Sequence, residues 1–257
     1  RPPAEVKLNV LPRIFGTLAA FLVAFLAFLP NIVVIVTSFF KTSGPLFVPG
    51  WSLDRYRTIF YKLGRDIKNT FVYSGIPMVF IVIIGILVAY LATKRKSASS
   101  SILDLVVMFP YVIPGTVFGI GLVLAFKNPP LKLVGTAAIL IISFVIRKIP
   151  YTVRSSSAIL QQIDPSIEEA SVSLGVSPMK TFFSVTARLM LPGIVSGAIL
   201  SWISTINELS STIMLYTGST STIAVDIYTE VIRASFGTAA ALASILTIAT
   251  ILSFVVF

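Results

Sequence analysis

The sequence predicts an all-α polytopic membrane protein with about six transmembrane helices in a single domain over residues 1–257. Hydrophobic residues make up 56% of the chain, and its mean hydropathy is +0.95. Charged residues make up only 12%, whereas soluble domains usually carry about a quarter. Basic residues gather at the ends of apolar runs, which predicts contact with membrane lipid and no binding of nucleic acid.

Six apolar runs approach the length of about 20 residues that a helix needs to cross the bilayer core. They cover residues 14–38, 69–92, 102–126, 134–153, 194–216 and 238–257. The first run is expected to be a retained helix, because no small-residue cleavage site follows its core. The charged and apolar residues of segment 53–68 are arranged as in an amphipathic helix that lies along the membrane surface.

The third run combines Pro110 and Pro114 with three glycines, the first of which is Gly115. Proline is tolerated in hydrocarbon where neighbouring helices satisfy the freed carbonyl groups, so this run belongs in a helix bundle. Two interpretations of Pro114 and Gly115 stay open at this point: close helix packing, or the lining of a passage through the bundle.

The fourth run is the weakest candidate for a transmembrane helix, because its residues are uncharged only as far as Ile146. We expect Arg147 and Lys148 to extend their side chains toward the lipid headgroups, which lets the helix continue to about Val153.

The chain contains neither His nor Cys. Disulfides, thiol chemistry, the usual zinc sites and histidine acid–base catalysis are therefore excluded. No Gly-rich phosphate-binding loop is present either. We expect no enzyme activity, no resident metal and no cofactor in this chain.

The segment DPSIEEASVSLGVSPMKTFFSV, residues 164–185, looks soluble although it lies between two apolar runs. Asp164 can cap a helix that begins at Pro165, and Glu168 and Glu169 suit the positive end of that helix. Gly175 is placed to end the helix in a left-handed conformation.

A second short helix is expected to follow, with Ser177 as its cap and Pro178 in its first turn. Phe182 and Phe183 would give it apolar surface, and the Phe and Leu side chains of the whole segment can enter a partner's groove. The segment is thus predicted to fold as helix, glycine turn and helix.

These residues resemble the EAA loop of permease subunits of binding-protein-dependent ATP-binding-cassette importers. The matching positions are Glu169, Ala170 and Ser171 at the triad, Gly175 at the glycine, Val185 at the aliphatic position and Pro192 at the second proline. The chain departs from the family pattern where Ala187 and Arg188 replace a Leu-Pro pair, which weakens the expectation of a sharp bend there.

The resemblance implies the type I importer permease architecture, also called MetI-like, in a bacterial cytoplasmic (inner) membrane. It implies that the cytoplasmic loop over about residues 155–190 couples the permease to an ATPase subunit, which binds the ATP. It also implies a second permease half or subunit and an extracytoplasmic substrate-binding protein. The coupling residues would be Glu168, Glu169, Ala170, Ser171, Gly175, Pro178 and Phe182.

Several other stretches, among them MFPYVIPGTVFGIG and NELSSTIMLYTGSTST, are most similar to permeases of ferric iron importers, and there to the second half of a fused tandem chain. Permeases for 2-aminoethylphosphonate, thiamine and polyamines are related, so these cargoes stay open.

Asn207 and Glu208 interrupt the fifth run near its middle. A carboxylate at that depth is costly and normally faces a polar interior or a partner. Glu208 is expected either to line the pathway or to hold the bundle together through hydrogen bonds. A competing class, a secondary transporter or channel, usually requires inverted repeats or several intramembrane charges.

Overall fold

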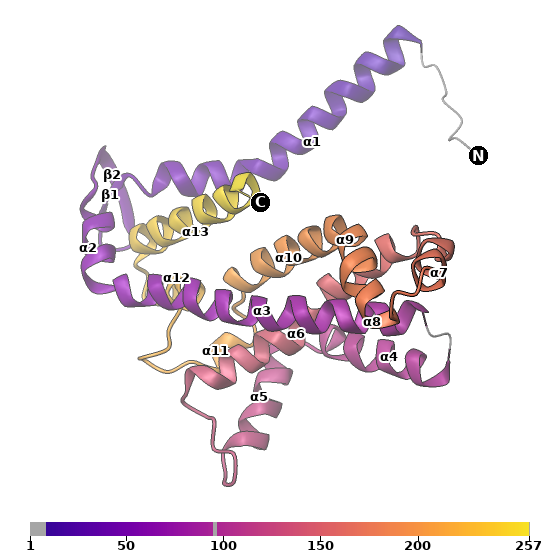
Figure 1. Cartoon of the computed structure of the whole chain (residues 1–257). Coiled ribbons are helices and arrows are strands. Elements are labelled where there is room, and N and C mark those ends of the chain that lie inside the picture. Colours follow the sequence, from indigo (N-terminus) through magenta and orange to yellow (C-terminus); the bar gives the residue numbers. More distant parts are fainter. Residues whose placement is uncertain (1–8, 95–96, 257) are drawn as a thin grey trace.

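The chain folds as a helical bundle with one long helix that leaves it (Figure 1). The computed structural model describes residues 9–94 and 97–256 of the 257. Its α-helices are α1 Val10–Thr37, α2 Asp54–Lys62, α3 Gly64–Lys94, α4 Ala98–Val112, α5 Gly115–Phe126, α6 Ala137–Leu160, α7 Pro165–Ser173, α8 Pro178–Thr181, α9 Ala187–Leu189, α10 Leu191–Ile206, α11 Thr212–Leu215, α12 Ile223–Ile232 and α13 Phe236–Val256. A π-helix, η1 Phe182–Thr186, joins α8 to α9.

A short antiparallel hairpin, β1 Phe40–Ser43 and β2 Leu46–Trp51, follows α1. The prediction of an all-α chain did not include it. α2 follows directly and confirms the amphipathic helix expected near residue 53, although α3 already begins at Gly64. We call the end of the bundle that carries the hairpin the hairpin end, and the end that carries α7 and α8 the loop end (Figure 1).

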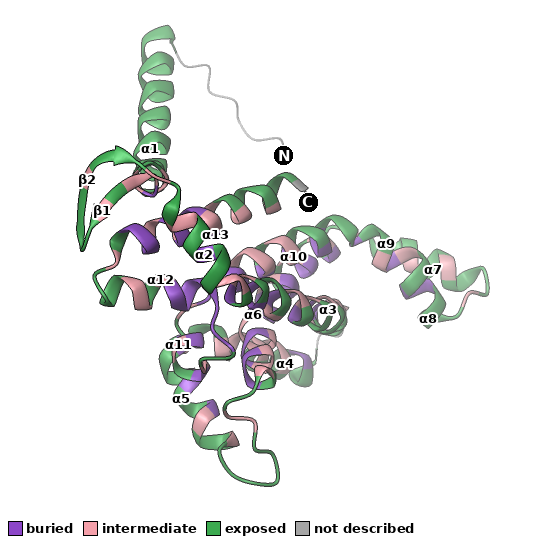
Figure 2. Cartoon of the chain, turned by 90° about the vertical axis from the view of Figure 1, so that its left-hand side faces the viewer, coloured by how far each residue is buried: buried purple, intermediate pink, exposed green. Residues whose placement is uncertain are grey.

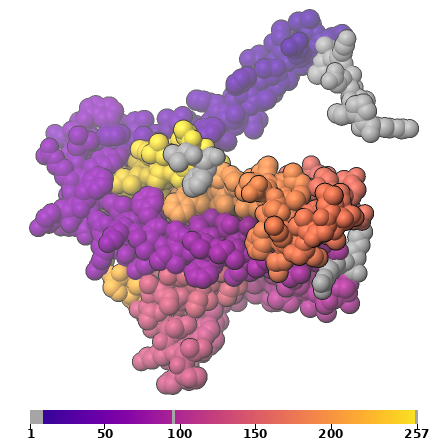
Figure 3. Space-filling view, in the orientation of Figure 1, coloured from indigo at the N-terminus to yellow at the C-terminus, as the bar shows by residue number. Residues whose placement is uncertain are grey.

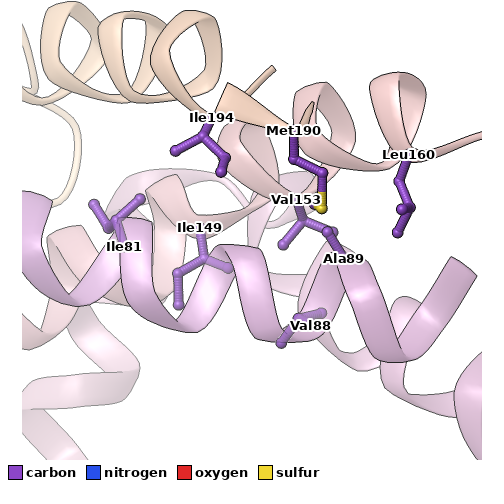
Figure 4. Close-up of a cluster of buried hydrophobic side chains, with 8 residues drawn as sticks. All are labelled: Ile81, Val88, Ala89, Ile149, Val153, Leu160, Met190 and Ile194. Carbon is purple, nitrogen blue, oxygen red and sulfur yellow. The ribbon is translucent and has the colours of Figure 1, made fainter. Parts of the chain in front are cut away.

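The centre of the bundle is α6, which packs between α3 and α10. One core cluster joins the three helices and the segment before α10 (Figure 4); it comprises Ile81, Val88, Ala89, Ile149, Val153, Leu160, Met190 and Ile194. Small residues allow the close approach. A Cβ atom on Gly85 of α3 would lie 2.8 Å from Thr152 Cγ2, and one on Gly197 of α10 would lie 2.7 Å from Thr152 Cα.

Within the described residues, α1, α3 and α13 are each long and apolar enough to cross a membrane, and five spans result if each of two bent helix pairs counts as one. α6 is not among them because Arg147, Lys148 and Arg154 lie within its 24 residues. Six spans were expected. The fourth predicted run corresponds to α6, an inner helix whose charged side chains have protein partners.

Two of the predicted continuous runs are broken in the structure. The third run divides into α4 and α5, which meet at an angle of 106° around Ile113 and Pro114. The fifth run ends as a helix at Ile206, and non-helical residues precede the short α11. Glu208 therefore lies in a break and not in the middle of a helical span.

α1 stands apart from the rest of the molecule (Figure 3) and none of its residues is buried. Only its carboxyl-terminal part packs, against α13. Buried residues gather instead where α3, α6, α10 and α12 meet (Figure 2). An apolar helix this exposed suits contact with lipid or with another membrane protein.

Replacing Gly197 with Ala should destabilise the bundle by about 1–3 kcal/mol, because the added methyl group meets the backbone of α6 and no flexible side chain can yield. The matched control is Gly121→Ala in α5, where an added Cβ meets nothing within 4 Å. Thermal unfolding of both variants in detergent checks this prediction. Equal unfolding temperatures would contradict the close packing of α6 and α10.

Candidate functional site

The loop between α6 and α10 begins with the capped helix that the sequence predicts. The Asp164 carboxylate accepts a hydrogen bond of 2.9 Å from the backbone N–H of Ser166, and Pro165 occupies the first helical position. This backbone hydrogen bond favours the ionised carboxyl group and lowers the pKa of Asp164.

The turn after α7 is set by Gly175, which has φ +84°. Two backbone hydrogen bonds close the helix end: Gly175 N–H donates to Val172 O at 2.9 Å, and Val176 N–H donates to Ser171 O at 3.3 Å. These bonds form the Schellman arrangement, whose left-handed residue is usually glycine. The predicted glycine turn is therefore present.

The second helix of the loop differs in part from the prediction. α8 begins at Pro178, but the Ser177 side chain makes no capping hydrogen bond. The helix continues through η1 and α9, and the chain then bends by 68° into α10. The bend lies at Met190, two residues before Pro192, although Arg188 replaces the proline that the family places earlier.

Glu168 braces the loop from inside. Its carboxylate accepts a hydrogen bond of 2.6 Å from Thr186 Oγ1 in η1 and pairs with Lys94 Nζ of α3 at 3.2 Å. Ser171 and Thr181 share a further hydrogen bond of 2.9 Å. These contacts fix α7 to η1, to α8 and to the end of α3, so the loop has a defined shape of its own.

The outward surface of the loop carries Glu169 and Ala170 together with exposed apolar side chains. Phe182 does not belong to that surface, contrary to the expectation, because it is buried against the Tyr90 ring with a centroid separation of 4.6 Å. Phe183 does face outward, and Leu174 and Met179 join it at exposures of 85% and 69%. We call Leu174, Met179 and Phe183 the apolar tip.

The exposure of Leu174 agrees with the expectation that the Phe and Leu side chains of the segment face a partner. Sequence reasoning missed Met179, whose signal was its place as an apolar residue in the first turn after Pro178.

A second group of candidate residues lies at the two helix breaks. Lys148 of α6 forms an ion pair with Glu208, and their exposed fractions are 5% and 8%. Glu208 also accepts a hydrogen bond of 3.1 Å from the Ser211 backbone N–H. The expectation that Lys148 reaches the headgroups is wrong, because a buried partner of opposite charge satisfies it within the bundle.

Arg147 serves the other break. Its Nη1 donates to the carbonyl oxygen of Ile113 at 2.9 Å and to that of Pro110 at 3.4 Å, while its guanidinium lies 5.7 Å from the centre of the Phe118 ring. These carbonyls belong to the last turn of α4, where a cation is favourable. Arg147 thus also stays within the protein and does not extend toward headgroups.

The glycines of the third run bring α5 against the segment after Glu208. A Cβ on Gly115 would lie 3.0 Å from the Ser211 nitrogen, and one on Gly119 would lie 2.8 Å from Met214 Cβ. Pro114 precedes this contact as the residue at the start of α5. Asn207 is exposed beside Glu208 and donates to Ile203 O at 2.8 Å and to Thr250 Oγ1 at 3.3 Å.

A buried carboxyl group lies at the hairpin end, in the short helix α12. Asp226 is 7% exposed and accepts a hydrogen bond of 2.7 Å from Ser221 Oγ. Burial, with smaller contributions from the carboxylates of Asp66 and Glu230, raises the pKa of Asp226 to about 6. Among the described residues no group of three His, Cys, Asp or Glu side chains is arranged to hold a metal ion.

Breaking the buried ion pair should be costly. Lys148→Met leaves the Glu208 carboxylate without its partner and should destabilise the fold by about 3–5 kcal/mol. The double variant Lys148→Met/Glu208→Leu should recover most of that loss, and Lys62→Met on the exposed surface of α2 is the control. Thermal unfolding in detergent measures all three. A double variant as unstable as the single one would argue against direct coupling of the two charges.

The protonation of Asp226 should make stability depend on pH. Because the folded state raises the pKa of this group from 3.8 to about 6, the folded state binds the proton more tightly, and its stabilising effect is present at low pH and lost as pH rises through about 6. The unfolding temperature should fall between about pH 4 and pH 6.5 and level off above that range, and Asp226→Asn should reduce that fall. The chain has no His, so an unchanged pH profile in Asp226→Asn would contradict the assignment.

Comparison with known proteins identifies a family and several relatives. The family described as "Binding-protein-dependent transport system inner membrane component" matches residues 81–257. The ferric transport system permease protein FbpB of Actinobacillus pleuropneumoniae is 33% identical over 178 residues, which make up 69% of this chain and 26% of that relative. The chain thus spans about a quarter of the length of that relative.

Two further similarities cover almost the whole chain. The putative 2-aminoethylphosphonate transport system permease protein PhnV of Salmonella paratyphi A is 26% identical over 238 residues, covering 92% of this chain and 90% of that protein. The fold is similar to that of a bacterial ABC transporter involved in the import of the acidic polysaccharide alginate, with a TM-score of 0.73 and 20% identity, covering 94% of this chain and 91% of the other.

Proposed function

Because the chain belongs to the family of binding-protein-dependent transport system inner membrane components, we propose that it is a permease half of an ATP-binding-cassette importer that carries ferric iron. The observation that carries the iron assignment is the 33% identity to a ferric transport permease over 69% of this chain. The more distant similarity to a putative 2-aminoethylphosphonate permease gives the alternative cargo.

The loop end is the side on which the ATPase subunit docks, and it therefore faces the cytoplasm. Three observations support this. The apolar tip is exposed, the loop is braced by Glu168 from within, and Glu169 points outward beside the tip. A preformed helical surface of this kind fits a hydrophobic groove on a partner. ATP binding and hydrolysis belong to that partner.

The hairpin end is then the extracytoplasmic side, where a substrate-binding protein would deliver the cargo. A second permease half would complete the membrane part. The long α1 supports such an assembly, because its surface is largely apolar and none of its residues is buried against the other described residues.

The test is uptake of radioactive iron in cells that lack the gene and are complemented with the full-length gene. The wild type should restore ATP-dependent uptake. Gly175→Val should lower uptake at least about tenfold, because a β-branched residue is strained by more than about 1 kcal/mol at a positive φ. The control is Gly218→Val, since no atom lies within 4 Å of an added Cβ there.

Three results would change the proposal. Normal uptake by Gly175→Val would contradict the coupling role of the loop. Restored uptake of 2-aminoethylphosphonate but not of iron would transfer the cargo assignment. Uptake that persists after ATP is depleted would favour a secondary transporter.

A further inference from the structure

The bundle has two kinds of outward face. On α3 the outward side chains are hydrocarbons, as at Val79, Ile83 and Leu87, which are 59%, 54% and 46% exposed. Such a face suits lipid. The face shared by α4, α6 and α10 differs, because hydroxyl and phenol groups are interspersed there with the apolar side chains. We call its members Tyr111, Tyr151, Ser155, Ser196 and Ser204 the hydroxyl track.

The members of the hydroxyl track contact one another across the three helices. Ser155 Oγ of α6 and Ser196 Oγ of α10 are 2.6 Å apart. Ser204 Oγ of α10 donates to the Tyr151 hydroxyl of α6 at 3.4 Å. The rings of Tyr111 on α4 and Tyr151 meet edge to face, with centroids 5.6 Å apart.

The track borders an open cavity of about 480 Å³ between α4, α6 and α10, whose lining includes Tyr111, Tyr151 and Ser155 alongside the apolar Met108, Pro150 and Leu200. Arg154 also lines this cavity, but its guanidinium pairs with Asp104 at 3.1 Å. Lys148 lies one turn from Tyr151 along α6, and its charge is paired with that of Glu208. The cavity therefore presents hydroxyl oxygen atoms among apolar side chains, and no carboxylate is among the described residues that line it.

The depth of the track makes its polarity informative. Tyr151 is the fifteenth of the 24 residues of α6, so it lies about 14 Å along the axis from the loop end of that helix. Polar groups at such depth normally face protein or a water-filled cavity, because lipid leaves their hydrogen bonds unsatisfied. The two hydrogen bonds within the track leave further donor and acceptor capacity on its hydroxyl groups.

We propose that the hydroxyl track is a wall of the substrate path and forms a water-filled transit site for a small hydrated cation. The identity of the cargo rests on the function proposed above. Hydroxyl and phenol oxygens suit a hard cation. Because they are neutral, they hold it weakly enough to let it leave, which conduction requires. Glu208, whose charge is neutralised by Lys148, then has a structural role beside the path and does not bind the cation.

Water access is tested first, in membranes that hold the complete importer. Since these 257 residues include no Cys, Ser155→Cys and Ser204→Cys each introduce a single thiol into them at little change in size. A charged, membrane-impermeant methanethiosulfonate reagent reacts with the thiolate, which forms only in contact with water, so both sites should react at least about ten times faster than a lipid-facing thiol. Val79→Cys on α3 is the lipid-facing control, and mass spectrometry reads the modification.

Cation contact is tested by removing single oxygen atoms. Tyr151→Phe keeps the ring against Tyr111 but loses the hydroxyl, and it should lower the rate of iron uptake severalfold while ATPase activity and unfolding temperature stay unchanged. Tyr61→Phe, on the 90% exposed side chain in α2, is the matched control.

The outcomes separate this inference from the proposed function. Modification of Ser155→Cys and Ser204→Cys no faster than that of Val79→Cys would overturn the water-filled path, whatever the cargo. Normal uptake by Tyr151→Phe would overturn the contact with the cation. Fast modification together with no iron uptake by the wild type would leave the path in place and remove iron as the cargo.

Discussion

The bundle depends on one buried ion pair, because a single unpaired charge in its interior would strongly destabilise the fold. Lys148 lies on α6, and Glu208 lies in the break after α10. Each neutralises the charge of the other, which offsets the cost of removing both charges from water. The pair also stops the fifth run from continuing as a helix, because Glu208 must turn toward α6 and accept the Ser211 N–H. Arg147 stabilises the other break, because it donates a hydrogen bond to the carbonyl oxygen of Ile113 at the end of α4. Two neighbouring basic residues on one inner helix thus hold both helix breaks.

Close packing makes this arrangement possible. Thr152 lies one turn beyond Lys148 and has a glycine on each side, Gly85 of α3 and Gly197 of α10. The three backbones therefore approach closely enough to exclude lipid and water from around the ion pair. The low polarity that results strengthens the attraction between the two charges, but it also makes each of them dependent on the other.

Local features of this chain were predictable from its sequence and long-range ones were not. The cap at Asp164 and the turn at Gly175 depend on the side chain or backbone of a few neighbouring residues, so the pattern of the sequence was sufficient. The membrane class followed from composition, and the importer family followed from the resemblance of the loop to a known motif; the family comparison confirms both. The buried position of Phe182 depends on Tyr90, and the pairing of Lys148 depends on Glu208, sixty positions away. Hydropathy along the chain carries no information about such partners. It therefore predicted continuous spans where the structure has breaks.

The brace at Glu168 and the unbroken course from α8 through η1 and α9 give the loop a mechanical property. The apolar tip is connected to α10 through the π-helix, α9 and the 68° bend at Met190. If a partner docks on the tip as proposed, a displacement of the tip would reach α10 through these braced residues. α10 carries Ser196 and Ser204, so a small rotation at the loop end would change which side chains face the cavity.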